Sequence, residues 1–144
     1  MYEVTTHRWF SGGHFIRQYG GACERLHGHN WKVEVTLSGK SLGPGGMLYD
    51  FRDLKKALDA VLEHLDHTML NDVAPFDTIE PSAENIAFFV AKRLAGDLAE
   101  AIAPSIQDIG VRVWETESSS ATYKAALIDL AGPRNGSGES RSVP

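Results

Sequence analysis

Trp31-Lys32-Val33-Glu34-Val35-Thr36-Leu37 is the stretch that decides the fold. Its large apolar residues alternate with charged and polar ones, the period of two that indicates a strand with one buried face. Residues 3–10 form a less regular strand pattern before it, and a glycine-rich stretch separates the two. The predicted fold therefore opens with a possible hairpin of two strands.

Two helices are predicted next, after a turn cluster of Gly, Ser and Pro over residues 38–46. Residues 53–65 carry apolar side chains at helical spacing, with Asp50 as the N-cap. A second helix is predicted over residues 82–102, with Ser82 as its cap.

Two more strand patterns follow, at residues 109–113 and 121–127. Runs of strands separated by a run of helices indicate an α+β fold, here with a four-stranded antiparallel sheet and both helices on one face. Such a sheet has two open edges, and open edges are normally paired or covered. We therefore expect a homo-oligomer in which neighbouring sheets join.

The composition is that of one domain of ordinary size. The chain has 144 residues and a formal net charge of −5, so nothing draws it strongly to nucleic acid or to an acidic membrane. It contains no apolar run long enough for a transmembrane helix and no signal-peptide pattern, and its single cysteine indicates a cytoplasmic protein. We expect a folded domain over residues 1–130 and a disordered polar tail over 131–144.

The densest reactive cluster is Cys23-Glu24-Arg25-Leu26-His27-Gly28-His29. In an extended segment His27 and His29 point to the same side and can reach one metal ion. His14 precedes them, within the possible hairpin, and can supply a third nitrogen. Three neutral imidazoles suit zinc and leave one coordination position open, as catalytic zinc sites require.

Cys23 has two interpretations on local grounds. As a fourth ligand it would close the zinc tetrahedron and leave no position for a substrate. As a thiol held near the metal and Arg25 it would have a lowered pKa and would act as a base or nucleophile.

Two acidic residues also have open interpretations. Asp66 beside His67 can orient an imidazole and stabilise its charged form if the two side chains touch, or the pair simply ends a helix. Glu115 continues the apolar parity of Val111 and Val113, where a carboxylate needs a partner such as two parallel N–H donors, or it belongs to a solvated strand end.

Taken together, these pieces resemble the 6-pyruvoyl-tetrahydropterin synthase superfamily, and within it the queuosine-pathway branch. The resemblance extends over about residues 5–125, and its segments occur in the family's order. The matching segments are Phe10-Ser11-Gly12-Gly13-His14, Cys23-x-x-x-His27-Gly28-His29, Met47-Leu48-Tyr49-Asp50-Phe51, Leu65-Asp66-His67 with Leu70-Asn71, Pro81-Ser82-Ala83-Glu84-Asn85, and Val113-Trp114-Glu115-Thr116.

The resemblance implies the tunnelling fold, and hexamers of two trimers with active sites at subunit interfaces. It implies one zinc ion per subunit and a catalytic triad whose aspartate and histidine come from a neighbouring subunit. The implied zinc ligands are His14, His27 and His29, the implied triad is Cys23, Asp66 and His67, and the implied pterin-binding residues are Glu115, Ser82, Ala83 and Glu84.

The implied substrate is 7,8-dihydroneopterin triphosphate. The short spacing from Cys23 to His27 resembles the queuosine-type enzymes, which release triphosphate and acetaldehyde and leave a 6-carboxyl group on the pterin. The alternative is the biopterin branch, in which the three-carbon side chain stays as a 6-pyruvoyl group. A non-catalytic module that holds a structural metal or a pterin without turnover is a further hypothesis.

Overall fold

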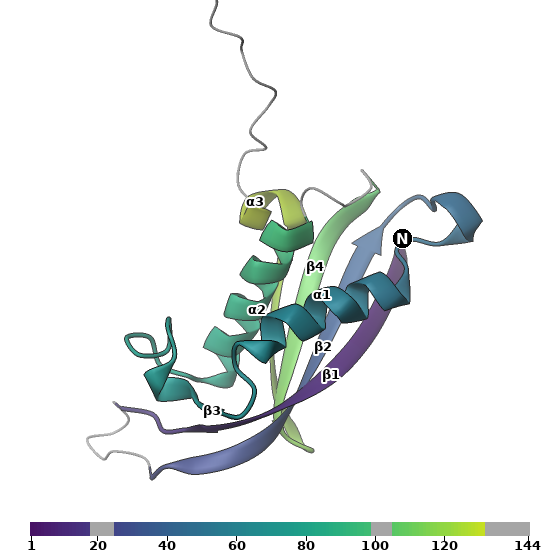
Figure 1. Ribbon diagram of the computed structural model, residues 1–144. Helices are drawn as coiled ribbons and strands as arrows, with labels where there is room; N and C mark the ends of the chain where they lie inside the picture. The colour runs from purple at the N-terminus through teal and green to yellow at the C-terminus, as the bar shows by residue number, and fades with distance from the viewer. Residues whose placement is uncertain (18–24, 99–104, 132–144) are drawn as a thin grey trace, which may run out of the picture.

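The computed structural model describes residues 1–17, 25–98 and 105–131. A five-stranded sheet, in the order β3-β1-β2-β4-β5, is covered on one face by helices α1 and α2 (Figure 1). The elements are β1 (Tyr2–His14), β2 (His27–Gly39), η1 (Pro44–Gly46), α1 (Phe51–Glu63), β3 (Thr68–Met69), η2 (Leu70–Asp72), α2 (Ala83–Leu98), β4 (Ile106–Thr116), β5 (Ser119–Ala126) and α3 (Leu127–Ala131).

The fold is α+β, as predicted, and its four long strands pair antiparallel. The prediction of a four-stranded, purely antiparallel sheet was wrong in one respect, because β3 is a fifth strand that pairs in parallel with β1. Gly12 and Gly13 face Thr68 and Met69 there. Two consecutive glycines leave this edge of β1 without side chains, so the chain after α1 can approach closely. A two-residue strand has no sequence pattern of its own.

The core lies between the sheet and the two long helices. Trp31, Val33, Val35 and Leu37 have no exposed surface, so the alternation along β2 is confirmed as one buried face. Both helices press an apolar stripe onto that face, formed by Leu54, Leu58, Val61 and Leu62 of α1 and by Ile86, Val90, Leu94 and Leu98 of α2.

Both long helices begin next to side chains that can cap them. The Asp50 carboxylate accepts a hydrogen bond from the Arg52 backbone N–H at 2.8 Å and starts α1. The Ser82 hydroxyl accepts one from the Asn85 backbone N–H at 3.2 Å, just before the second turn of α2. These contacts satisfy N–H groups that have no partner inside a helix.

The first two strands run further than the pattern predicted. β1 continues past residue 10 to His14, and β2 already begins at His27. The two extensions pair with each other and form the end of the hairpin, which lies beside β3 in Figure 1. The last predicted strand ends at Ala126, because the short helix α3 takes up Leu127.

Three predicted features lie outside the described residues: Cys23, the end of the second helix over residues 99–102, and nearly all of the tail over 131–144. Among the helices that the structure describes, none is both long and apolar enough to cross a membrane.

Candidate metal centre

The register of the β1–β2 hairpin places three histidines together. His14 pairs directly with His27, and His29 pairs with Gly12, two residue pairs nearer the middle of the sheet. Alternation along the two strands turns all three rings to the side of Trp31, which is the side covered by the helices. The ring of Trp31 lies beneath them, with centroids 4.9 Å from His14 and 5.2 Å from His29.

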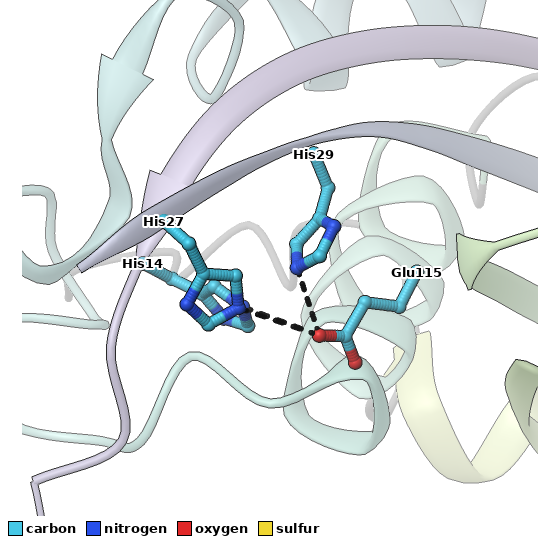
Figure 2. A group of neighbouring side chains, drawn as sticks. All are labelled: His14, His27, His29 and Glu115. Atoms are coloured by element: carbon cyan, nitrogen blue, oxygen red, sulfur yellow. Dashed lines mark hydrogen bonds and ion pairs between the residues drawn. The ribbon is translucent and has the colours of Figure 1, made fainter. Parts of the chain in front are cut away.

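The three rings and one carboxylate converge on a single point. Figure 2 shows His14, His27 and His29 turned toward Glu115. The Nε2 atoms of His14 and His27 are 3.0 Å apart, and Glu115 Oε1 lies 2.9 Å from His29 Nε2, 3.4 Å from His14 Nε2 and 3.8 Å from His27 Nε2. Zinc bonds of 2.0–2.1 Å in a tetrahedron imply ligand atoms about 3.4 Å apart. The spacing of these four atoms therefore fits one bound metal ion.

The hydrogen bonds behind two of the rings favour the tautomer that binds metal. His14 Nδ1 lies 2.8 Å from the Pro81 carbonyl oxygen, and His27 Nδ1 lies 2.7 Å from that of Arg25. A carbonyl only accepts, so each Nδ1 donates and each Nε2 of a neutral ring carries a lone pair. Two lone pairs facing each other at 3.0 Å repel unless a cation lies between them. The donor set thus calls for a positive charge at its centre.

The environment of His29 also favours a bound metal ion. Its Nε2 is buried and faces the Glu115 carboxylate oxygen at 2.9 Å. Burial lowers the pKa of His29 below its ordinary value, the neighbouring His27 and His14 add to this, and Glu115 opposes it. A lowered pKa keeps the imidazole neutral, the form in which it binds metal. The residues present therefore fit zinc, and three imidazoles are the donors that zinc accepts readily.

Glu115 occupies its place because β4 is irregular there. Trp114 pairs with Ser120 and Thr116 with Ser119, so Glu115 has no partner on β5 and forms a bulge. Its side chain is one-third exposed at the edge of the cluster. The sequence predicted the side of the strand on which Glu115 lies, but not its closeness to the histidines. That closeness depends on β4 lying next to β2, which no local pattern reveals.

The segment expected to line a pterin pocket lies beside the cluster. Ser82, Ala83 and Glu84 form the start of α2, directly after the Pro81 carbonyl that accepts from His14. Ala83 is nearly buried, whereas Glu84 is exposed. The structure thus brings this segment to the histidines through the main chain of Pro81.

Asp66 and His67 touch each other, but they lie on the face of the sheet that points away from the helices. Asp66 Oδ2 lies 2.9 Å from His67 Nδ1, and Asp66 Oδ1 accepts the Ser11 backbone N–H at 2.9 Å. The pair lines a surface hollow with Trp9 and Asn30, whose side chains alternate with the buried ones and face away from the helices. The histidine cluster is on the helix side. The structure therefore forms the pair but does not join it to the cluster of its own chain.

The fold and the site together define an α+β protein in which the β1–β2 hairpin supplies three imidazoles, and β4 a carboxylate, to a candidate metal centre. The model of the 6-pyruvoyl tetrahydropterin synthase family matches residues 3–126. The chain belongs to that family, whose members are lyases acting on pterins.

Curated relatives bear two names. The chain is 32% identical to the 6-carboxy-5,6,7,8-tetrahydropterin synthase of Bacillus subtilis, over 91% of this chain and 90% of that protein. It is 35% identical to the 6-pyruvoyl tetrahydrobiopterin synthase of Poecilia reticulata, over 68% of this chain and 65% of that protein. Among solved structures, the 6-pyruvoyl tetrahydropterin synthase of Caenorhabditis elegans matches with 29% identity and a TM-score of 0.66, over 87% of this chain and 97% of that one. The similarity to solved family structures confirms the expected tunnelling fold.

Proposed function

We propose that the chain is a zinc-dependent 6-carboxy-5,6,7,8-tetrahydropterin synthase. It converts 7,8-dihydroneopterin triphosphate and one water molecule into 6-carboxytetrahydropterin, acetaldehyde and triphosphate, for queuosine and related 7-deazapurines. The observation that carries the proposal is the convergence of His14, His27 and His29 with their Nε2 atoms turned to one point beside Glu115. The name shared by several curated relatives, including that of Bacillus subtilis, supports the choice of product.

The three histidines and Glu115 have different tasks in this reaction. His14, His27 and His29 hold the zinc ion. Bound zinc polarises hydroxyl oxygens of the substrate side chain and acidifies the adjoining C–H and O–H groups. Glu115 accepts two N–H bonds from the pterin ring edge, which fixes the ring at the rim of the centre. The start of α2 at Ser82–Glu84 forms a wall of the same pocket.

Proton transfer is the task of the proposed triad. Cys23, as thiolate, removes a proton from the substrate side chain, and His67, oriented by Asp66, exchanges protons on the opposite side. His67 has a positive φ of 56°, a conformation that costs a non-glycine residue energy and recurs at functional sites. Its side chain is 81% exposed, which suits a group that acts outside its own subunit.

The same geometry supports a proposal for the assembly. Asp66 and His67, here called the dyad, lie on the face of the sheet opposite the histidine cluster of their own chain. One complete site therefore needs the histidine cluster of one copy and the dyad of another. We therefore propose a homo-oligomer with interfacial active sites, and a hexamer of two trimers as its form. The long free stretch of β1, which pairs with β3 only at Gly12 and Gly13, offers an edge for such joining.

The second candidate is a 6-pyruvoyl-tetrahydropterin synthase, which eliminates triphosphate without cleaving the side chain. The similarity to the Poecilia reticulata enzyme favours it. The family model that matches this chain is itself described as 6-pyruvoyl tetrahydropterin synthase. The two candidates differ in the fate of the side-chain carbons, and not in the metal centre.

Product analysis separates them. The full-length chain loaded with one equivalent of Zn²⁺ is incubated with 7,8-dihydroneopterin triphosphate, and triphosphate, acetaldehyde and the pterin product are quantified. Equal amounts of triphosphate and acetaldehyde support the carboxy reaction. Triphosphate without acetaldehyde assigns the pyruvoyl reaction instead. Release of neither, by protein with zinc bound, leaves the non-catalytic module.

A further inference from the structure

Arg17 lies three residues after His14, and its charge alone makes it a candidate for binding triphosphate. The structure turns its guanidinium inward. Nη2 donates to the Phe76 carbonyl at 2.6 Å and to the Asn71 carbonyl at 3.2 Å, and only 28% of the side chain is exposed. Donors that are used on carbonyls of its own chain are not directed at a ligand. Arg17 therefore has a task inside the fold.

Glu80 is the second half of the arrangement. Its Oε2 accepts the Arg17 backbone N–H at 2.7 Å, and its Oε1 lies 3.4 Å from Arg17 Nη1. The backbone carbonyl of Glu80 accepts from Asn85 Nδ2 of α2 at 2.9 Å. Glu80 is thus held at both its side chain and its main chain, between the end of β1 and the start of α2.

Pro81 follows directly and connects this pair to the metal centre. Its carbonyl oxygen accepts from His14 Nδ1 at 2.8 Å, and the His14 side chain is only 2% exposed. A ring so enclosed takes its orientation from that one hydrogen bond and from the packing around it. Glu80 and Pro81 share a peptide plane, and the proline ring fixes the φ of Pro81, so only the ψ rotation of Pro81 separates the held residue 80 from the Pro81 carbonyl.

Asn71 holds the backbone on the other side of His14, at Phe15. Its side chain accepts the Phe15 backbone N–H at 3.0 Å and donates to the Phe15 carbonyl at 2.9 Å. Phe15, the residue after His14, is therefore tied to the segment between β3 and α2. The Pro81 carbonyl that accepts from His14 belongs to that segment too. That segment is the part of the chain to which the Arg17 guanidinium also bonds.

We propose that Arg17 and Glu80 form a positioning pair for the metal centre. The pair holds the Pro81 carbonyl against His14 Nδ1, and thereby keeps His14 Nε2 pointed at the site shared with His27 and His29. Arg17 is a positioning residue, and it does not bind the triphosphate. The proposal rests on the metal centre of the proposed function, and it does not depend on which pterin product is formed.

The test measures zinc affinity of the full-length chain by competition with a chromophoric chelator, together with the visible absorption bands of the Co²⁺-loaded protein. Arg17→Met removes the guanidinium and keeps an aliphatic stem, and Arg17→Lys retains one charged donor group. Glu80→Gln removes the charge and keeps an acceptor. Arg52→Met is the matched control, because Arg52 is 90% exposed and pairs only locally with Asp50.

Loss of an outer partner of a metal ligand typically lowers metal affinity by about 10–100-fold. We expect a loss of about tenfold for Arg17→Met and Glu80→Gln, a smaller loss for Arg17→Lys, wild-type affinity for Arg52→Met, and altered Co²⁺ bands wherever affinity falls. The double variant Arg17→Met/Glu80→Gln should lose no more than the worse single one, because the two residues act as one unit. If Arg17→Met does not fold, Arg17→Lys and Glu80→Gln carry the same test.

Wild-type zinc affinity in both Arg17→Met and Glu80→Gln would overturn the proposal. A raised KM for 7,8-dihydroneopterin triphosphate in that case assigns Arg17 to phosphate binding, and a lowered melting temperature assigns the pair a structural role only. Absence of zinc binding by the wild-type chain refutes the metal centre and this proposal together. Zinc binding without any lyase product refutes only the proposed reaction.

Discussion

Asp66 Oδ2 and His67 Nδ1 are 2.9 Å apart although the two residues are consecutive in the chain. Neighbouring side chains rarely meet in this way, and here the contact forms where the chain leaves α1 with His67 at a φ of 56°. The Ser11 backbone N–H holds the other carboxylate oxygen, at 2.9 Å. The dyad is thus assembled by β1 and by the turn after α1, away from the cluster of its own chain.

Mixing two inactive variants tests whether the proposed site is shared between subunits. Cys23→Ala and His67→Ala are each expected to lose turnover. If cysteine and histidine come from different chains, co-refolding equal amounts should restore about a quarter of the wild-type activity, because about a quarter of randomly formed sites combine the intact Cys23 of one chain with the intact His67 of another. The measurement is triphosphate release per subunit.

A pair of variants that damage the same side supplies the control. A mixture of Asp66→Ala and His67→Ala should stay inactive, because both act in the dyad. No recovery in the Cys23→Ala and His67→Ala mixture, when hybrid oligomers are present, would place the whole triad in one chain.

Glu115 is predicted to bind substrate and not to be needed for metal. Glu115→Gln removes a charged acceptor and adds an amide donor facing the pterin N–H groups. Loss of about 3 kcal/mol of charge-assisted hydrogen bonding corresponds to roughly 100-fold in kcat/KM. Bound zinc, measured by metal analysis, should stay at the wild-type level. The exposed Glu117→Gln, two residues further along the chain, is the matched control. Loss of zinc from Glu115→Gln would instead make this carboxylate a fourth ligand.

The Asp66 carboxyl predicts a change of stability with pH. The hydrogen bond from the Ser11 backbone, and then contact with His67, hold the pKa of Asp66 below its ordinary value of 3.8. The unfolded chain therefore binds a proton first as the pH falls, so the stabilisation is complete above the unfolded pKa and is lost as the pH drops through the folded one. In urea unfolding, the stability difference between wild type and Asp66→Asn should be largest above about pH 5 and shrink below about pH 4. The exposed Asp77→Asn serves as control, and an equal shrinkage in that variant would argue against the assignment.

Two glycines are predicted to respond in opposite ways to alanine. A Cβ on Gly39 would collide with the Ser105 carbonyl oxygen, so Gly39→Ala should destabilise the fold by about 3 kcal/mol. Among the described residues, apart from its chain neighbours and the backbone of its own helix, nothing lies within 4 Å of such an atom on Gly96. Gly96 is an exposed helical residue of α2, and Gly96→Ala should stabilise by about 0.5–1 kcal/mol. Urea unfolding of both variants checks the signs. The pairing of β2 with β4 shifts register between Ser38 and Gly39. A neutral Gly39→Ala would mean that this irregular end of β2 moves to accommodate the added atom.

The hairpin and the helices could be predicted from the sequence because their signals are local. The alternation from Trp31 to Leu37, the Asp50 cap and the helical stripes each belong to one segment, and the structure contains them all. Strand β3 could not be predicted, since its two residues become a strand only by meeting the bare edge at Gly12 and Gly13. The lengths of β1 and β2 were underestimated for a related reason. Their ends are rich in glycine, which is a poor strand former on its own.

In the candidate site, too, the features with local signals could be predicted and those that depend on tertiary contacts could not. The i, i+2 spacing of His27 and His29, with His14 in the facing strand, predicted the convergence that the structure contains. The position of Glu115 against them required the order of strands in the sheet. The inward turn of Arg17 required the contacts of the segment between β3 and α2, which the charge of one residue does not reveal.

The pairing of His14 with His27 has a consequence for insertions and deletions. All three histidines lie on one hairpin, so the centre is encoded in the spacing of residues along two strands as much as in their identity. Deleting Gly13 would turn His14 toward the opposite face of the sheet, because side chains alternate at every residue. Every proposed ligand would remain in the sequence and the centre would be gone. Relatives that differ in length in this hairpin are thus expected to differ by changes in the connection between β1 and β2, and not within residues 12–14 or 27–29.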